Sequence, residues 1–228
     1  MLALKQALSL VSSKSLGGSW LPTDDADLLS WYQKNTGITL SGADVSNWED
    51  SSGNAYHMAQ TDGTKMPEWN VAGEYLEFDG TGEHLSSSSQ MSITADFTVG
   101  VKLSPVTPFG TVLARVSAGD QEWLRIINTT TLRVKIDNTG AVDLTLDGTD
   151  VWSSGYLVLT RVSGLLSMWW NGVLQADTDT KTGTVDIDAI GIRNPANNPF
   201  NGDITEIQIY KNSSASLSAN VNDRLASL

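Results

Sequence analysis

The sequence has no cysteine among its 228 residues and only two histidines. The lack of cysteine excludes disulfides, thiolate metal sites and cysteine nucleophiles, and it leaves the redox compartment undetermined. Basic residues are also scarce, since 14 Lys and Arg stand against 26 Asp and Glu, for a formal net charge of −12. This charge favours solubility and repels phosphate backbones and anionic lipids. We therefore expect neither a nucleic acid nor a membrane as partner.

Long apolar runs are missing as well, because none approaches the ~18–20 residues that a membrane-spanning helix needs. Residues 1–11 invite comparison with a signal peptide. Their apolar stretch is interrupted by Gln6 and Ser9, and no small-residue cleavage site follows in residues 12–15. We interpret the N-terminus as mature sequence.

Residues 1–22 predict a short N-terminal arm. Leu4, Ala7, Leu8 and Val11 have the i, i+3, i+4, i+7 spacing of an amphipathic helix, and Gly17-Gly18 would end it. A helix of a dozen residues is marginal alone and needs a surface to cover. That surface is either the arm's own domain or another subunit, and the pattern does not decide between them. For the second case, Leu4, Leu8 and Val11 are the expected docking residues.

Residues 23–228 predict a single all-β domain. In Thr131–Asp137, Leu132, Val134 and Ile136 alternate with polar neighbours, which is typical of a strand with one buried face. Six other segments are expected to be strands: 74–78, 97–103, 123–128, 156–162, 165–170 and 204–210. Ile207 and Ile209 should point inward in the last of them. A short terminal helix is expected over Asn220–Leu228.

A β-hairpin is the strongest local prediction. Asn171-Gly172 tolerates the positive φ angles that a two-residue type I′ turn demands. Leu165–Trp170 should therefore pair with Val173–Asp177. Many short strands with no long helical period indicate a β-sandwich.

Seven segments, in order, resemble the laminin-G-like, concanavalin-A-like jelly-roll family. They are LLSWY at 28–32, VSNWEDSSGN at 45–54, LEFDG at 76–80, FTV at 97–99, LTR at 159–161, MWWNG at 168–172 and FNGDITEIQIY at 200–210. The resemblance covers about residues 26–212 and leaves the arm outside. It implies an all-β jelly-roll sandwich of two antiparallel sheets.

This resemblance implies no single function, because such domains serve as lectins, as appendages of glycanases and adhesins, and as structural proteins of tailed phages. A lone domain with a short arm most resembles the phage variety. We therefore expect a non-catalytic virion protein, in capsid decoration, a fibre or a tail, that self-associates or binds other virion proteins through the arm. The alternative is a carbohydrate-binding lectin-type module, extracellular or secreted. A glycoside hydrolase is the second alternative.

The sequence predicts no enzyme. Glycosidases of this fold carry paired carboxylates on one strand face, and the nearest approach is Asp186 and Asp188, without a glutamate partner. Glu206 stands alone on its strand, so a polar outer face explains all three better. His57 and His84 lie in expected loops, and no Gly-x-Ser-x-Gly motif supplies a serine nucleophile.

Calcium is the one cofactor that the sequence suggests. Hard cations prefer several oxygen ligands, and the candidates are Asp50 and Asn54 in one turn and Asp203 at the start of the last strand. The competing interpretation is that Asp and Asn in tight turns hydrogen-bond their own backbone.

One tryptophan is the candidate contact for a carbohydrate or a protein partner. If Leu166, Met168 and Trp170 face the core, Trp169 faces outward, where an aromatic ring can stack on a sugar or anchor an interface. The competing interpretation is that Trp169 covers a neighbouring strand or the arm. Trp31, Trp48 and Trp170 are expected in the core, whereas the positions of Trp123 and Trp152 are left open.

Overall fold

The structure is a computed structural model that describes residues 19–107, 109–117, 122–137, 139–193 and 197–228. This part of the chain forms eighteen strands, a short 3-10 helix (Pro22–Asp24) and one α-helix, α1 (Ala215–Ala226). The predicted all-β jelly-roll sandwich is confirmed. The expected docking residues Leu4, Leu8 and Val11 lie outside the described residues.

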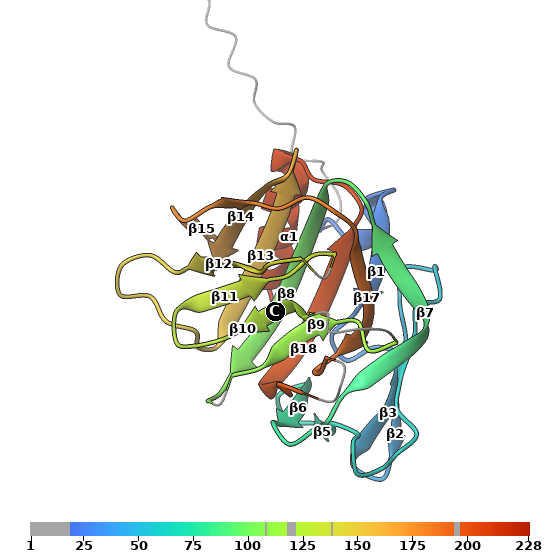
Figure 1. Cartoon of the computed structure of the whole chain (residues 1–228). Coiled ribbons are helices and arrows are strands. Elements are labelled where there is room, and N and C mark those ends of the chain that lie inside the picture. Colours follow the sequence, from blue (N-terminus) through green and yellow to red (C-terminus); the bar gives the residue numbers. More distant parts are fainter. Residues whose placement is uncertain (1–18, 108, 118–121, 138, 194–196) are drawn as a thin grey trace, which may run out of the picture.

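One sheet of the sandwich carries α1 on its outer surface, behind the strands in Figure 1. Its central strand, β18 (Asn201–Tyr210), pairs with β8 along its length, with β1 near its C-terminal end and with β6 near its N-terminal end. The other bounds are β1 (Leu28–Tyr32), β6 (Tyr75–Asp79), β8 (Phe97–Pro105), β13 (Gly155–Val162), β14 (Leu165–Trp170), β15 (Val173–Leu174) and β16 (Asp179–Thr180). All pairings are antiparallel, and β13 lies between β8 and β14.

The second sheet faces the viewer in Figure 1, in the order β7–β17–β9–β10–β11–β12. Its strands are β7 (Leu85–Ile93), β9 (Thr111–Ala114), β10 (Glu122–Ile126), β11 (Thr131–Val134), β12 (Val142–Thr145) and β17 (Val185–Ile190). Four short strands connect its β7 edge to β6 of the first sheet: β2 (Ile38–Ser41), β3 (Asp44–Trp48), β4 (Met58–Ala59) and β5 (Glu68–Asn70).

The main core lies between the two sheets, because each strand alternates its side chains across the sheet. Trp48 and Trp123 are among its largest buried side chains, and Trp152 packs edge-on against Trp170. Ile207 and Ile209 point into this core, as predicted. The predicted hairpin turn is confirmed: Trp170 pairs with Val173 around Asn171 and Gly172, both of which have positive φ. Its second strand, β15, ends at Leu174 instead of the predicted Asp177.

Helix α1 begins earlier than the sequence predicted, at Ala215 instead of Asn220. Ser214 is the N-cap, and its Oγ accepts a hydrogen bond from the Leu217 backbone N–H at 3.1 Å. The helix buries Leu217, Val221 and Leu225 against the outer surface of β8 and β13. In this part of the chain, no helix has the length and apolar character to cross a membrane.

The helix corrects one expectation about polarity. Glu206 was expected on a polar outer face, yet its side chain is fully buried because α1 covers that face. It accepts two hydrogen bonds from the guanidinium of Arg224, at 3.0 and 2.8 Å.

The two aspartates of β17 were also expected on a polar outer face. Asp188 is buried and accepts hydrogen bonds from the backbone N–H groups of Val116 and Ser117, whereas Asp186 forms an ion pair with Arg115.

Candidate functional site

A groove of about 610 Å³ lies between α1 and the outer surface of β13 and β14. Trp169 and Tyr156 contribute its aromatic surface, and Val162 and Leu165 extend this surface toward the β13–β14 turn. Pockets of this size are typical of small-molecule sites, which combine apolar walls with a few polar groups.

The strand register explains why these side chains share one surface. Val158 pairs with Trp169, Thr160 with Ser167 and Val162 with Leu165, and directly paired residues lie on the same face of a sheet. Their neighbours Leu166, Met168 and Trp170 fill the core. Trp169 is partly buried against the apolar cluster beneath α1, which includes Val158, Val221 and Leu225. It also lines the groove, so the ring packs on this cluster and remains accessible to a ligand.

The hairpin turn holds Tyr156 at one end of the groove. The Asn171 side chain accepts a hydrogen bond from the Tyr156 backbone N–H at 3.0 Å, and the Asn171 N–H donates to the Tyr156 carbonyl at 2.9 Å. A Cβ atom on Gly172 would lie 2.9 Å from the Tyr156 hydroxyl. Glycine at this position therefore provides the positive φ and also the space for the phenol.

Helix α1 supplies the polar wall. Asn222 donates from Nδ2 to the Ser218 carbonyl at 2.8 Å. Its Oδ1, and the Oγ of Ser213, are buried without a hydrogen-bond partner among the residues that the structure describes. Buried polar atoms are normally satisfied, so these two atoms mark a wall that can accept hydrogen bonds from a ligand after small side-chain rotations.

The three candidate calcium ligands do not converge. Asp50 and Asn54 share a loop beside β1, whereas Asp203 lies in β18 opposite Glu77 of β6. Both carboxylate oxygens of Asp50 already accept hydrogen bonds, and Asn54 donates from its amide to the carbonyls of Leu28 and Leu29. Within the described ranges, no group of three or more His, Asp or Glu side chains is placed to hold a metal ion.

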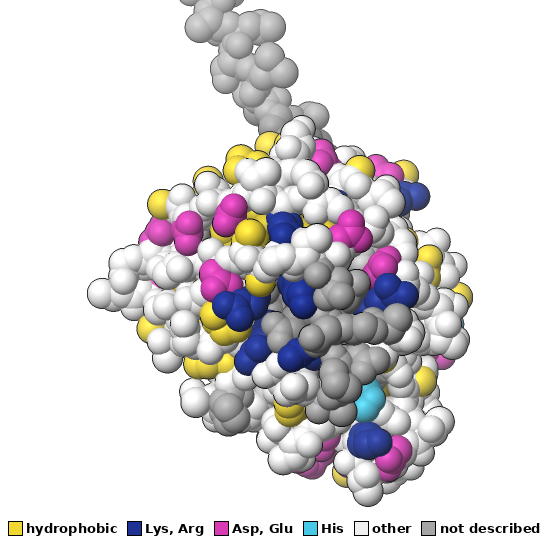
Figure 2. Space-filling view, viewed as in Figure 1, with side chains coloured by type: hydrophobic (Ala, Val, Ile, Leu, Met, Phe, Trp, Pro, Cys, Tyr) yellow, Lys and Arg dark blue, Asp and Glu magenta, His cyan; other side chains and the backbone are white. Residues whose placement is uncertain are grey.

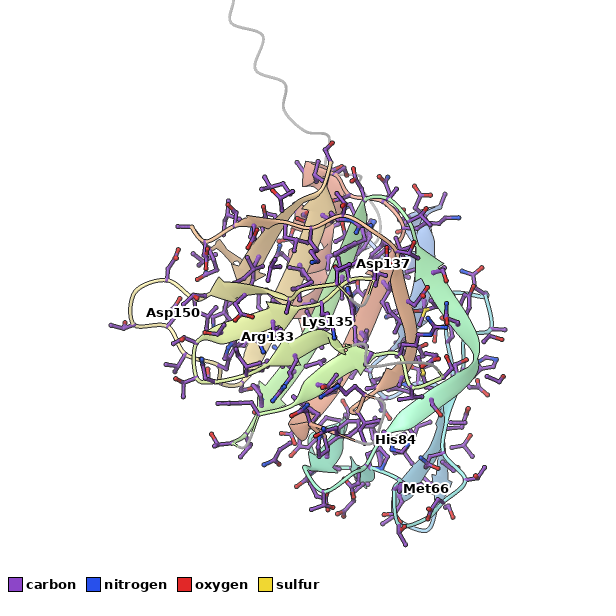
Figure 3. All side chains as sticks on the ribbon, viewed as in Figure 1. Met66, His84, Arg133, Lys135, Asp137 and Asp150 are labelled. Carbon is purple, nitrogen blue, oxygen red and sulfur yellow. The ribbon has the colours of Figure 1, made fainter. Side chains whose placement is uncertain are left out.

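Both histidines hold loops in place. His57 Nδ1 accepts the Asp50 backbone N–H at 3.1 Å. His84, labelled in Figure 3, lies 3.0 Å from the Gln60 amide through Nε2 and 2.8 Å from the Gly82 carbonyl through Nδ1. Among the residues that the structure describes, neither histidine is part of a nucleophile–base pair.

The structure brings together two carboxylates from neighbouring strands, a pair that the sequence did not predict. Asp203 of β18 stands directly opposite Glu77 of β6. Burial, and then the negative charge of Glu77, raise the pKa of Asp203 to about 6. Burial also raises the pKa of Glu83 to about 7, with the neighbouring carboxylates adding to the effect. A carboxyl whose pKa is raised to about 6 is chemically able to gain or lose a proton near neutrality.

These pKa shifts predict that stability decreases from about pH 4.5 to 7.5. Because the folded-state pKa of Asp203 and Glu83 lies above the unfolded value, their contribution is complete below about pH 4 and is lost as the pH rises through about 6 and 7. Both groups are partly exposed, so we expect about 1 kcal/mol from each after solvent screening. Urea unfolding of wild type, Asp203→Asn and Glu83→Gln at several pH values in this range measures how the free energy of unfolding depends on pH. A variant with the wild-type pH slope would refute the assignment for that residue.

The opposite face of the sandwich has a different character. Figure 2 shows Lys and Arg side chains gathered over the second sheet, and Figure 3 places Arg133 and Lys135 at β11 within this group. The region also contains acidic partners: Arg133 forms a two-pronged ion pair with Asp143, and Arg115 contacts Asp186 through one nitrogen at 3.0 Å. The groove beside α1 is not part of this surface.

No protein-family model and no curated protein matches the chain, but solved structures do. A Trypanosoma rangeli sialidase in complex with sialic acid aligns over 89% of this chain at 13% identity, with a TM-score of 0.58, and the chain spans 33% of the sialidase. Botulinum neurotoxin type C, described as depending on two ganglioside molecules for cell entry, aligns over 89% of this chain and 52% of its own at 15% identity, with a TM-score of 0.55.

A domain of matching size is also similar. Domain 4 of AbnA, a GH43 extracellular arabinanase from Geobacillus stearothermophilus, was solved in complex with arabinotriose. It aligns over 88% of this chain and 98% of its own length, at 18% identity and a TM-score of 0.57. Likenesses at these identities show a shared fold.

These comparisons correct the expectation that the chain is not an enzyme. A sialidase and a GH43 arabinanase are enzymes, so the fold occurs within glycosidases and the missing carboxylate motif does not exclude catalysis. None of the three descriptions names a phage protein, and a phage role is not shown by them.

Proposed function

We propose that the chain is a carbohydrate-binding β-sandwich domain and that the groove beside α1 holds the glycan. The observation that carries this proposal is the partly buried ring of Trp169 beside Tyr156, in a groove whose other wall is polar. A sugar ring has one apolar C–H face and a rim of hydroxyls, so it fits a site that offers an aromatic surface and hydrogen-bonding groups together.

The polar groups stand where such a rim would meet them. Asn222 and Ser213 line the groove from the α1 side with buried acceptor oxygens that would meet the ligand after side-chain rotation, and Ser167 lines it from the strand side. Because Trp169 is fixed by its pairing with Val158 and by the cluster beneath α1, little conformational entropy is lost when a ring stacks on it. The glycan complexes of the similar structures support this function for the fold.

The proposal predicts that Trp169→Ala lowers the affinity for a glycan at least tenfold, because the stacking surface is lost. A glycan array identifies the ligand class, and isothermal titration then compares wild type with the variant. Leu40→Ala, a truncation of an exposed apolar residue on β2, is the control and should bind as wild type does. Circular dichroism verifies that each variant is folded.

Two outcomes would change the conclusion. Unchanged affinity in a folded Trp169→Ala variant would remove the glycan from this groove. Absence of any glycan hit for wild type would refute the function itself. The release of reducing sugar is followed in the same samples, since release that requires Asp203 would make the chain a hydrolase rather than a binding domain.

A further inference from the structure

Resting on the proposed carbohydrate-binding function, we propose that the groove selects neutral glycans over acidic ones and that Asp223 determines this specificity. Among the described residues that line the groove, Asp223 is the one charged side chain, and none is Lys, Arg or His. A carboxylated sugar would place a negative charge in a site whose own fixed charge is negative.

Asp223 is exposed on the last turns of α1, where the helix C-terminus adds negative potential. Among the described residues, no Lys or Arg side chain forms an ion pair with its carboxylate. The negative charge of Asp223 therefore lies at the rim of the groove and is not neutralised by an ion pair within the described part of the chain.

The charge of Asp223 acts on the groove itself. Burial raises the pKa of the Tyr156 phenol, and the negative charge of Asp223 raises it further. Lys102 of β8 lies outside the lining, with its ammonium 5.5 Å from the centroid of the Tyr156 ring. Burial, and then the positive charge of Lys34, lower the pKa of this lysine.

A group of Lys and Arg side chains lies over the second sheet, on the face seen in Figure 2. Arg115 directly follows β9 and Arg133 lies in β11, and they form ion pairs with Asp186 and Asp143 respectively. An acidic glycan that binds the protein through that face would neither compete with a neutral glycan in the groove nor respond to Asp223. Competition therefore separates the two locations.

Matched asialo and sialylated forms of the same glycan are the probes, together with neutral arabinotriose. Wild type should bind the neutral form on the order of tenfold more tightly than the acidic form, because like charges placed together oppose binding. Asp223→Asn should narrow this ratio of affinities, and Asp223→Lys should invert it. Asp150→Lys, a charge reversal on an exposed loop distant in sequence, is the matched control and should keep the wild-type ratio.

The outcomes distinguish this inference from the proposed function. Equal binding of both forms by wild type, with mutual competition and loss in Trp169→Ala, would overturn the selectivity and leave the carbohydrate site in place. A wild-type ratio in folded Asp223→Lys would overturn the role of Asp223. Failure of every probe and every array glycan to bind would refute the proposed function and this inference with it.

Discussion

Replacing Arg224 with alanine is expected to lower the free energy of unfolding by about 3–5 kcal/mol, the range for breaking a buried ion pair from one side. The Arg224 guanidinium donates two hydrogen bonds to Glu206, at 3.0 and 2.8 Å, and the Glu206 side chain has no exposed surface. Without the guanidinium, a buried carboxylate would face Gln208 and the Lys34 backbone N–H alone. Most of the loss therefore comes from the uncompensated charge.

The same substitution should weaken glycan binding, because Arg224 attaches the helix that forms one wall of the groove. The guanidinium lies 5.6 Å from the Trp31 ring centroid on β1, so it connects α1 to two strands. Underneath, Gly100 leaves space for the helix, since a Cβ there would lie 2.5 Å from Val221. The helix is thus held by one buried ion pair and a closely fitted apolar surface.

Urea unfolding measures the effect, and Asp143→Ala is the matched control. Asp143 and Arg133 form an ion pair of the same two-pronged geometry, with both side chains more than a third exposed at 40% and 35%. Surface pairs contribute about 0–1 kcal/mol. The double variant Glu206→Met, Arg224→Met should recover most of the stability, since it leaves no buried charge. If Arg224→Ala and Asp143→Ala lowered the free energy of unfolding equally, burial of Glu206 would not be the cause of the loss.

The alternation of apolar residues was sufficient to predict most of the sandwich. Thr131–Asp137 and Leu165–Trp170 bury every second residue, and the Asn171-Gly172 turn has the predicted geometry. The observed β11 ends at Val134, although Ile136 remains in the core. Local periodicity reports which side chains are buried, but the extent of a strand depends on its partner.

Features that depend on tertiary contacts could not be predicted from the sequence. Nothing near Glu206 in the chain indicates that a helix beginning at Ala215 folds back over it. The opposition of Asp203 and Glu77 requires knowledge that β18 pairs with β6, and the two residues are far apart in the sequence. The outward position of Trp169 followed from alternation alone, whereas the groove around it depends on where α1 docks.

Replacing Asp50 with alanine is expected to lower the free energy of unfolding by about 3–4 kcal/mol, because one buried carboxylate connects β1 to the loop that carries it. Its Oδ1 accepts the backbone N–H groups of Trp31 and Ser52, both at 2.9 Å. Its Oδ2 accepts the Ser52 hydroxyl at 2.8 Å and the Tyr56 N–H at 3.1 Å. Hydrogen bonds to a charged group are stronger than neutral ones, and a buried N–H left without an acceptor costs its full desolvation.

The same contacts predict the response to calcium. A carboxylate whose two oxygens already serve four donors has little capacity left for a cation, so about 1 mM calcium or a chelator should leave the melting temperature of wild type unchanged. Asp50→Asn keeps one acceptor oxygen and should lose less stability than Asp50→Ala. If calcium raised the melting temperature of wild type but not of Asp50→Asn, this loop would instead be a metal site. The hydrogen bonds that Asp50 accepts do not depend on calcium, so they alone could not produce that result.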